Sequence, residues 1–136
     1  MGKSQVKGKF LIDTNIAIYF LEGILPEESK DYIIDILSHE SNLSVISKIE
    51  LLSWNKLTTK QESKTRTFIQ ASNVKSLSDK IIETTIKIRK KGRKIKLPDA
   101  IIAATAMEYK YTLLTRNIKD FENIKGLKCL NPFDEN

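Results

Sequence analysis

Short apolar segments alternate with longer segments of helical periodicity along most of this chain. Five apolar segments have the length and composition of strands: 9–13, 42–47, 73–77, 112–115 and 128–130. Helical patterns occupy the intervals between them and beside them: 15–21, 26–37, 47–57, 59–69, 78–91, 98–110 and 117–121. Strands that alternate with helices predict a mainly parallel sheet with helices on both faces, an α/β fold of three layers (α/β/α).

Several boundaries of these helices are marked by residues that favour helix ends. Gly23 is expected to stop the first helix, and Ser47 and Ser78 are expected to cap two later ones. Thr59 and Glu62 have the spacing of a capping box. These signals predict where each helix begins and ends, and hence the order of the elements.

Length and composition favour one domain. The chain has 136 residues, of which 40% are hydrophobic, enough for one core. We expect the domain to span 10–133 after a flexible lead-in at 1–9. One cysteine and one histidine leave no internal disulfide and no zinc site built from these residue types. The sequence has no apolar run long enough to span a membrane, and a reducing cytoplasm is compatible with it.

Four acidic residues border or interrupt apolar segments, where carboxylates are seldom placed without a partner. Asp13 ends the first strand, and Glu50 lies in the helix that follows the second. Asp99 occupies the first turn of the helix before the strand at 112–115, and Asp120 follows that strand. Ligands of parallel sheets bind beyond the carboxyl ends of the strands, so we expect the four carboxylates to meet there.

Each acid also has a simpler interpretation. Asp13 has the position of a helix cap, and Asp99 the position of an acid that favours a helix dipole. Glu50 and Asp120 are also compatible with ordinary surface positions. The coincidence of all four at one edge of the predicted sheet favours a functional cluster.

A carboxylate cluster without His or Cys ligands selects hard cations, chiefly Mg²⁺ with Mn²⁺ as a substitute. We assign Asp13 and Asp99 as the principal metal ligands. Glu50 and Asp120 are expected to hold metal-bound waters or a second ion. Such a site is typical of enzymes that hydrolyse phosphodiester bonds without a covalent intermediate.

A cluster of basic residues precedes Asp99. Its members, in the segment RKKGRKIK, are Arg89, Lys90, Lys91, Arg93, Lys94 and Lys96. The formal net charge of +6 favours a polyanionic partner, and these side chains are candidates for contacts with the phosphates of a nucleic acid. A solvated helix end is the alternative, because cations suit the last turn of a helix.

The segments that carry the acids resemble those of PIN-domain ribonucleases, and in particular the VapC-type toxins of toxin–antitoxin pairs. The matching segments are LIDTNI, SKIELL, LPDAIIAATA and LLTRNIKDF, which together extend over nearly the whole chain from residue 10 to about residue 132. The resemblance implies a three-layer α/β/α PIN-like domain, metal-dependent cleavage of RNA, homodimerisation and an antitoxin protein as partner.

Four polar residues next to these acids are expected to hold the carboxylates by hydrogen bonds, as metal sites usually require. They are Thr14, Asn15, Thr115 and Asn117. The RNA substrate and its cleavage site are not encoded in any motif that the sequence shows.

Other classes of protein remain as alternatives. A haloacid-dehalogenase-like phosphatase would carry a second acid where this chain has Asn15, and a receiver domain would carry an acidic pair before its aspartate. A PIN-like RNA-processing nuclease without a toxin role would share all four acids. A non-catalytic RNA-binding module is a further possibility, and the presence of all four acids disfavours it.

Overall fold

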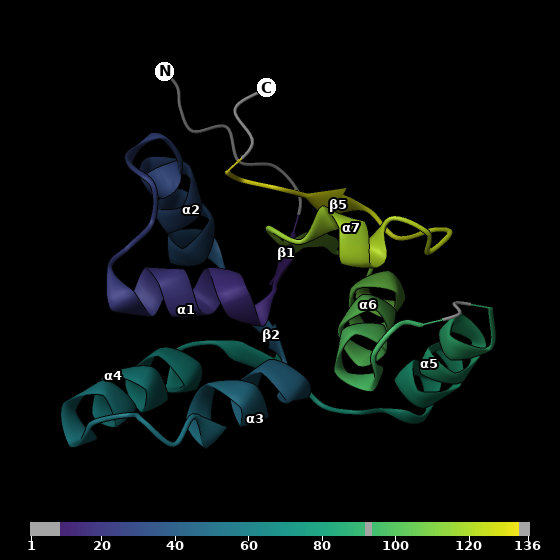
Figure 1. The fold of residues 1–136 in the computed structure, drawn as a ribbon, viewed down its shortest axis with the longest axis horizontal. Coiled ribbons are helices and arrows are strands. Elements are labelled where there is room, and N and C mark those ends of the chain that lie inside the picture. Colours follow the sequence, from purple (N-terminus) through teal and green to yellow (C-terminus); the bar gives the residue numbers. More distant parts are fainter. Residues whose placement is uncertain (1–8, 92–93, 134–136) are drawn as a thin grey trace.

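The computed structural model describes residues 9–91 and 94–133, so most of the predicted lead-in lies outside the described residues. Within them, five strands form one sheet between two helical layers (Figure 1). The strands are β1 (Phe10–Ile12), β2 (Asn42–Ser44), β3 (Asn73–Lys75), β4 (Thr112–Leu114) and β5 (Cys129–Leu130). Their order is β3-β2-β1-β4-β5 and each pairing is parallel, which confirms the predicted α/β class.

The helices are α1 (Thr14–Glu22), α2 (Glu27–His39), α3 (Val45–Ser53), α4 (Thr59–Gln70), α5 (Asp79–Lys91), α6 (Leu97–Tyr109) and α7 (Ile118–Phe121). None of the described helices is both long enough and apolar enough to cross a membrane.

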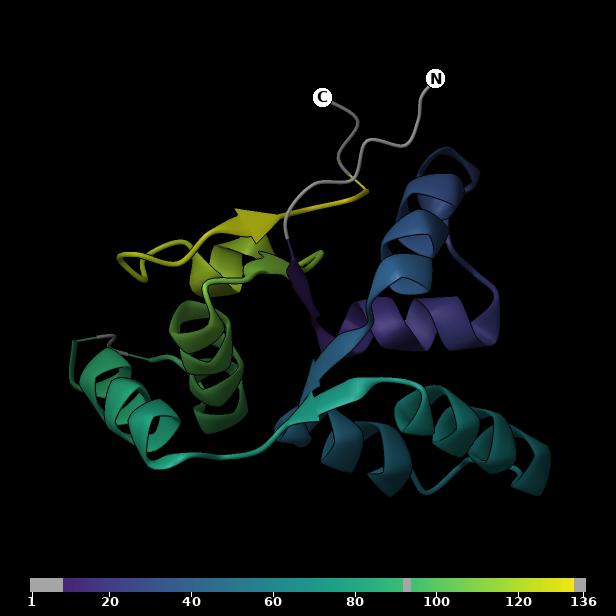
Figure 2. The same cartoon turned by 180° about the vertical axis from the view of Figure 1, so that it is seen from behind.

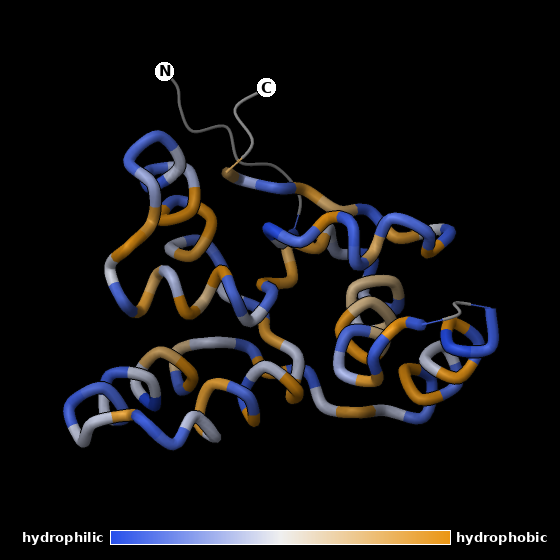
Figure 3. Tube along the Cα trace, in the orientation of Figure 1, coloured by the Kyte–Doolittle hydropathy of each residue, from blue (hydrophilic) through white to orange (hydrophobic). Residues whose placement is uncertain are grey.

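Side chains of the central strand β1 alternate between the two helical layers, as the period of a strand requires. Leu11 packs into a cluster with α5 and α6, whereas Phe10 and Ile12 pack with α1, α2 and α4. In Figure 2, α5 and α6 lie on one side of β1, and α1, α2 and α4 lie on the other. Apolar segments accordingly line the inside of both layers, and polar segments lie outside (Figure 3). The alternation gives the domain two cores, one on each face of the sheet.

Helix α6 is buried around most of its circumference. Ala100, Ala103, Ala104 and Ala106 are each fully buried, and the helix contacts both α5 and the sheet. Alanine side chains allow this close approach because they occupy little volume. The helix therefore lies between the sheet and α5 (Figure 1).

The N-cap of helix α3 lies three residues earlier than the sequence predicted. Its cap is Ser44, whose hydroxyl accepts a hydrogen bond from the backbone N–H of Ile46 at 3.1 Å. The predicted cap, Ser47, lies inside the helix and is fully buried. Strand β2 is correspondingly short, because the chain turns into the helix directly after Ser44.

The capping box of α4 is shifted by one residue from the prediction. Thr58 accepts from the N–H of Gln61, and the Gln61 side chain accepts from the N–H of Thr58. Glu62 instead forms an ion pair with Arg66 at 2.9 Å. The predicted cap of α5 is confirmed, because the hydroxyl of Ser78 accepts from the N–H of Ile81.

The order of the strands creates a crevice between β1 and β4. The chain passes from β1 to β2 on one side, and β4 later pairs with β1 on the other, so the helices that follow β1 and β4 diverge. The backbone N–H of Asp13 donates to the carbonyl of Leu114 at 3.0 Å, just beyond the last residue of β1. The crevice thus opens directly beside Asp13.

Asn42 connects three strands in the interior. Its fully buried side chain donates to the carbonyl of Phe10 and accepts from the amide of Asn73.

We expect Asn42→Ala to lower the free energy of unfolding by about 2 to 4 kcal/mol, because a buried carbonyl loses its donor. The control Asn55→Ala, at an exposed position without a side-chain hydrogen bond among those described, should cost less than about 1 kcal/mol. Urea denaturation measures both, and equal losses would contradict the role of Asn42.

Candidate active site

The carboxylate of Asp13 is held at the N-terminus of α1 and is only 5% exposed. One oxygen, Oδ1, accepts from the backbone N–H of Thr14 at 2.9 Å. The other, Oδ2, accepts from the hydroxyl of Thr115 at 2.7 Å, and the N–H of Asn117 donates to that hydroxyl at 3.0 Å. Asp13 therefore caps a helix, as the simpler interpretation held, and faces the crevice as well.

A second set of hydrogen bonds holds Glu50. The hydroxyl of Thr14 donates to its Oε1 at 2.6 Å and lies 2.8 Å from the hydroxyl of Ser47. Because Thr14 gives its single proton to Glu50, Ser47 must donate to Thr14. The sequence analysis assigned Ser47 to a cap and missed this role. The spacing of three residues between Ser47 and Glu50, on one helix face, was the available signal.

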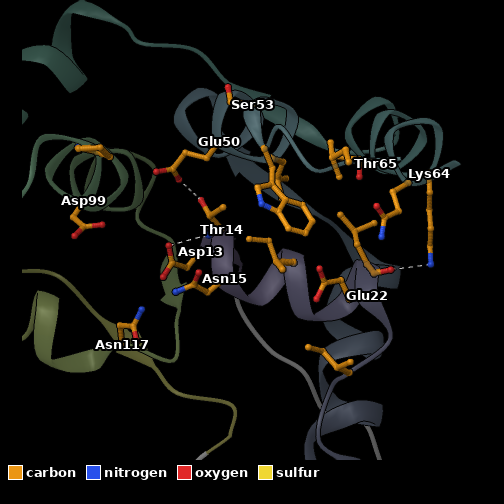
Figure 4. Close-up of a pocket in the computed structure, with 18 of the residues that line it drawn as sticks. Asp13, Thr14, Asn15, Glu22, Glu50, Ser53, Lys64, Thr65, Asp99 and Asn117 are labelled. Carbon is orange, nitrogen blue, oxygen red and sulfur yellow. Dashed lines mark hydrogen bonds between the residues drawn. The ribbon is translucent and has the colours of Figure 1, made fainter. Parts of the chain in front are cut away.

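All four predicted acids line one cavity of about 1100 Å³, which we call the acid cavity. Asp99 is partly buried in the first turn of α6, whereas Glu50 and Asp120 are exposed at its rim. Figure 4 shows Asp13, Glu50 and Asp99 directed into the same space from α1, α3 and α6. The crevice thus brings together carboxylates from four separate parts of the sequence, as predicted.

The other predicted polar residues lie beside this cavity. Thr14, Asn15 and Asn117 line it, and Thr115 lies behind Asp13 as its hydrogen-bond donor. The hydroxyl of Thr14 donates a hydrogen bond to Glu50, and the hydroxyl of Thr115 donates one to Asp13. Among the described hydrogen bonds, the side-chain amides of Asn15 and Asn117 contact neither Asp13 nor Glu50, so their role stays a prediction.

The environment of the cavity opposes ionisation of Asp13 and Asp99. The pKa of Asp13 is raised from 3.8 to about 6, chiefly by burial and in addition by the charges of Asp99 and Glu50, whereas the hydrogen bonds from Thr115 and Thr14 lower it. Burial also raises the pKa of Asp99, as do the charges of Asp120 and Glu50, while Lys96 lowers it. The cavity therefore contains negative charge that the protein compensates only in part.

The donors at this site are oxygen atoms. Burial raises the pKa of the Cys129 thiol to about 11, and His39 lies on α2, where it contacts Asp35. In the part of the chain that the structure describes, no three Asp, Glu, His or Cys side chains are grouped as a ready-made metal site. Mg²⁺ often takes only one or two carboxylates and keeps several waters, so the oxygen donors around the acid cavity fit this ion.

The predicted RNA-binding residues separate into two groups. Lys96 lines the acid cavity, and Lys91, Lys94 and Lys96 all line a second cavity beside it. Arg89 and Lys90 are exposed and line neither cavity. Arg93 lies outside the described residues.

The PIN domain family matches residues 10–127, and the chain belongs to this family. One similar solved structure is a chain of a toxin–antitoxin complex from Klebsiella pneumoniae. It is 32% identical with a TM-score of 0.73, over 93% of this chain and 99% of that one. Another is VapBC2 from Rickettsia felis, described as bound to a DNA fragment from its promoter. It is 27% identical with a TM-score of 0.75, over 90% of this chain and 97% of that one.

A shorter match links the chain to Ribonuclease VapC1 of Rickettsia felis. It is 56% identical over 32 residues, which are 24% of this chain and 24% of that protein. The match therefore covers about a quarter of that relative's length.

The raised pKa of Asp13 predicts how the metal-free protein responds to pH. The protonated carboxyl favours the fold below about pH 4, and this contribution is lost as pH rises through about 6. In EDTA, the stability of Asp13→Asn relative to wild type should therefore increase from pH 4 to pH 7, by up to about 3 kcal/mol.

Chemical denaturation at each pH measures this difference. Asp31→Asn, which changes an exposed acid on α2, is the matched control and should show a flat difference across the same range. A variant that is less stable than wild type by the same amount at every pH would mean that Asp13 acts only as a helix cap.

Proposed function

We propose that this chain is a metal-dependent endoribonuclease that cleaves cytoplasmic RNA as the toxin of a toxin–antitoxin pair. The observation that carries the proposal is the acid cavity. Asp13, Glu50, Asp99 and Asp120 surround it at the crevice of a parallel sheet, and burial together with the charges of these neighbours raises the pKa of Asp13 and of Asp99. Partly compensated carboxylates of this kind suit a divalent cation.

Asp13 and Asp99 are the proposed ligands of Mg²⁺, with Mn²⁺ as a substitute. Glu50 and Asp120 lie on the rim and would hold metal-bound waters or a second ion. When bound, the metal ion lowers the pKa of water and neutralises charge on the phosphate.

The protein's own contribution is to fix these carboxylates before substrate binds. Each oxygen of Asp13 accepts one hydrogen bond, from Thr14 or Thr115, and keeps a lone pair that can face the cavity. Glu50 is oriented by Thr14. Donors of this kind set the direction of a metal ligand, and their loss typically reduces metal affinity or activity by about 10- to 100-fold.

The relatives support the biological role. One bears the name Ribonuclease VapC1, and two similar structures are described as a toxin–antitoxin complex and as VapBC2. For this chain we propose an antitoxin partner and a homodimer. Exposed isoleucines on α3 and α5, Ile49, Ile82 and Ile86, offer apolar surface for contact between two copies.

One end of the acid cavity offers a surface for the antitoxin. Ile18, Leu21 and Leu57 line this end, together with Ile24 and Trp54, which are 55% and 47% exposed. Large apolar side chains at this exposure are suited to burial against a partner protein. An antitoxin bound there would also obstruct access to the carboxylates.

The nuclease proposal predicts metal-dependent cleavage. Purified protein should cleave RNA with Mg²⁺ or Mn²⁺ and should stop in EDTA, because the ionised cavity repels phosphate when no cation is bound. Asp99→Asn should lose at least about 100-fold in cleavage rate, since a metal ligand contributes several kcal/mol. Asp31→Asn should cleave at the wild-type rate.

The assay also separates the alternatives. Full activity in EDTA would refute metal dependence. RNA binding without cleavage under any metal condition would favour the non-catalytic RNA-binding module.

The toxin proposal predicts growth arrest when the chain is expressed alone and relief when a neighbouring antitoxin frame is expressed with it. Ile24→Ala with Trp54→Ala should weaken relief and co-purification, because the proposed contact surface is lost. Ile34→Ala, at an exposed apolar residue of α2, is the control. Cleavage in vitro without growth arrest or a co-purifying partner would instead favour an RNA-processing nuclease.

A further inference from the structure

A second cavity, of about 880 Å³, lies beside the acid cavity between α5, α6 and α7. These helices are neighbours in both views of the fold (Figures 1 and 2). Lys96, Asp99 and Asp120 line both cavities. A ligand that occupies the second cavity can therefore continue directly to the proposed catalytic carboxylates.

Lysines from both walls line this second cavity, which we call the lysine groove. They are Lys87, Lys91, Lys94, Lys96, Lys119 and Lys125. None of the six forms an ion pair with another described residue. Among the described residues, three acids line the groove, Asp99, Glu108 and Asp120, and Glu108 accepts a hydrogen bond from Thr84. Positive charge is therefore in excess along the groove.

The floor of the groove is apolar. Ile88, Ile95, Met107 and Ile124 line it between the lysines. Lysine stems can pack along such a surface while their ammonium groups stay in water. A volume of this size is in the range of ligand clefts and is sufficient for a few nucleotides of a single strand.

The distribution of cations around the acids is asymmetric. On the far side of the carboxylates, the acid cavity ends in the apolar surface around Trp54. Two lysines line that end, Lys60 and Lys64, and the ammonium group of Lys64 is hydrogen-bonded to the carbonyl of Leu21. Six lysines line the other side, so electrostatic attraction for phosphates is stronger on the side of the lysine groove.

We propose that the lysine groove binds the nucleotides on one side of the scissile phosphate of single-stranded RNA. Phosphates contact the lysines of the two walls, and riboses or bases lie against the apolar floor. This inference rests on the proposed nuclease function and adds Lys87, Lys119 and Lys125, which lie outside the basic segment around Arg93. Affinity is then salt-dependent and indifferent to most of the sequence on that side.

Helix α5 provides a matched pair of variants for the test. Lys87→Ala with Lys91→Ala removes two cations from the groove, whereas Arg89→Ala with Lys90→Ala removes two from the same helix that do not line it. All four side chains are exposed, so both variants should fold. The probe is a short, labelled, mixed-sequence single-stranded RNA, bound in EDTA at several salt concentrations.

The groove variant should bind several-fold more weakly at low salt. Its plot of log affinity against log salt should flatten by about 1.4, from about 0.7 for each lost phosphate contact. The control variant should match wild type. Lys119→Ala with Lys125→Ala, from the opposite wall, should reproduce the loss. Equal effects of the two α5 variants would mean that only overall charge matters and would overturn the groove.

A second measurement tests the restriction to one side. Cleavage rates of wild type and the Lys87/Lys91 variant are compared on RNAs shortened from either end. Shortening at one end should abolish the difference between the two proteins, and shortening at the other should preserve it. A difference that survives both would overturn the inference. Failure of the wild-type protein to cleave any RNA would instead overturn the nuclease proposal. The binding experiment in EDTA does not require cleavage, so it tests the groove independently of that proposal.

Discussion

The structure depends on the position of β1 at the centre of the sheet. Parallel partners lie on both sides of it, and the backbone N–H of Asp13 donates to the carbonyl of Leu114. A carboxylate at the end of such a strand has little contact with water, so its negative charge must be compensated by hydrogen-bond donors or cations. The first N–H of α1 and the hydroxyl of Thr115 provide part of it. The remaining negative charge makes the crevice a site for a cation.

The sequence was sufficient for the class of fold and for the meeting of the four acids, because both follow from short-range patterns. An apolar segment that ends in an acid places that acid at the edge of a parallel sheet, whatever the rest of the chain does. Asp13 could be placed in this way, and Asp99 could be placed from its position in the first turn of the helix that leads into β4. Their separation from one another and the asymmetry of charge around them could not be predicted, since both depend on how α6 and α7 pack.

The errors have a common cause. Ser44 and Ser47 are both plausible caps, and Thr58 or Thr59 can each begin a capping box with the residue three positions later. Local sequence patterns alone cannot distinguish between two such cap positions. Ser47 is excluded from the cap by its contact with Thr14, which lies 33 positions earlier in the sequence. Similarly, the basic segment looked like one block, whereas the helix turns Lys91 toward the groove and Lys90 away from it.

The alanines of α6 have a mechanical consequence. Asp99 sits in the first turn of a helix whose next two turns are clamped between the sheet and α5, with Ala100, Ala103, Ala104 and Ala106 fully buried. A densely packed interior has no space for a larger side chain at Ala103, so we expect such a side chain to shift the whole helix. Asp99 would move with it. The spacing of the carboxylates therefore depends on the small size of the Ala103 side chain, a residue that lines neither cavity.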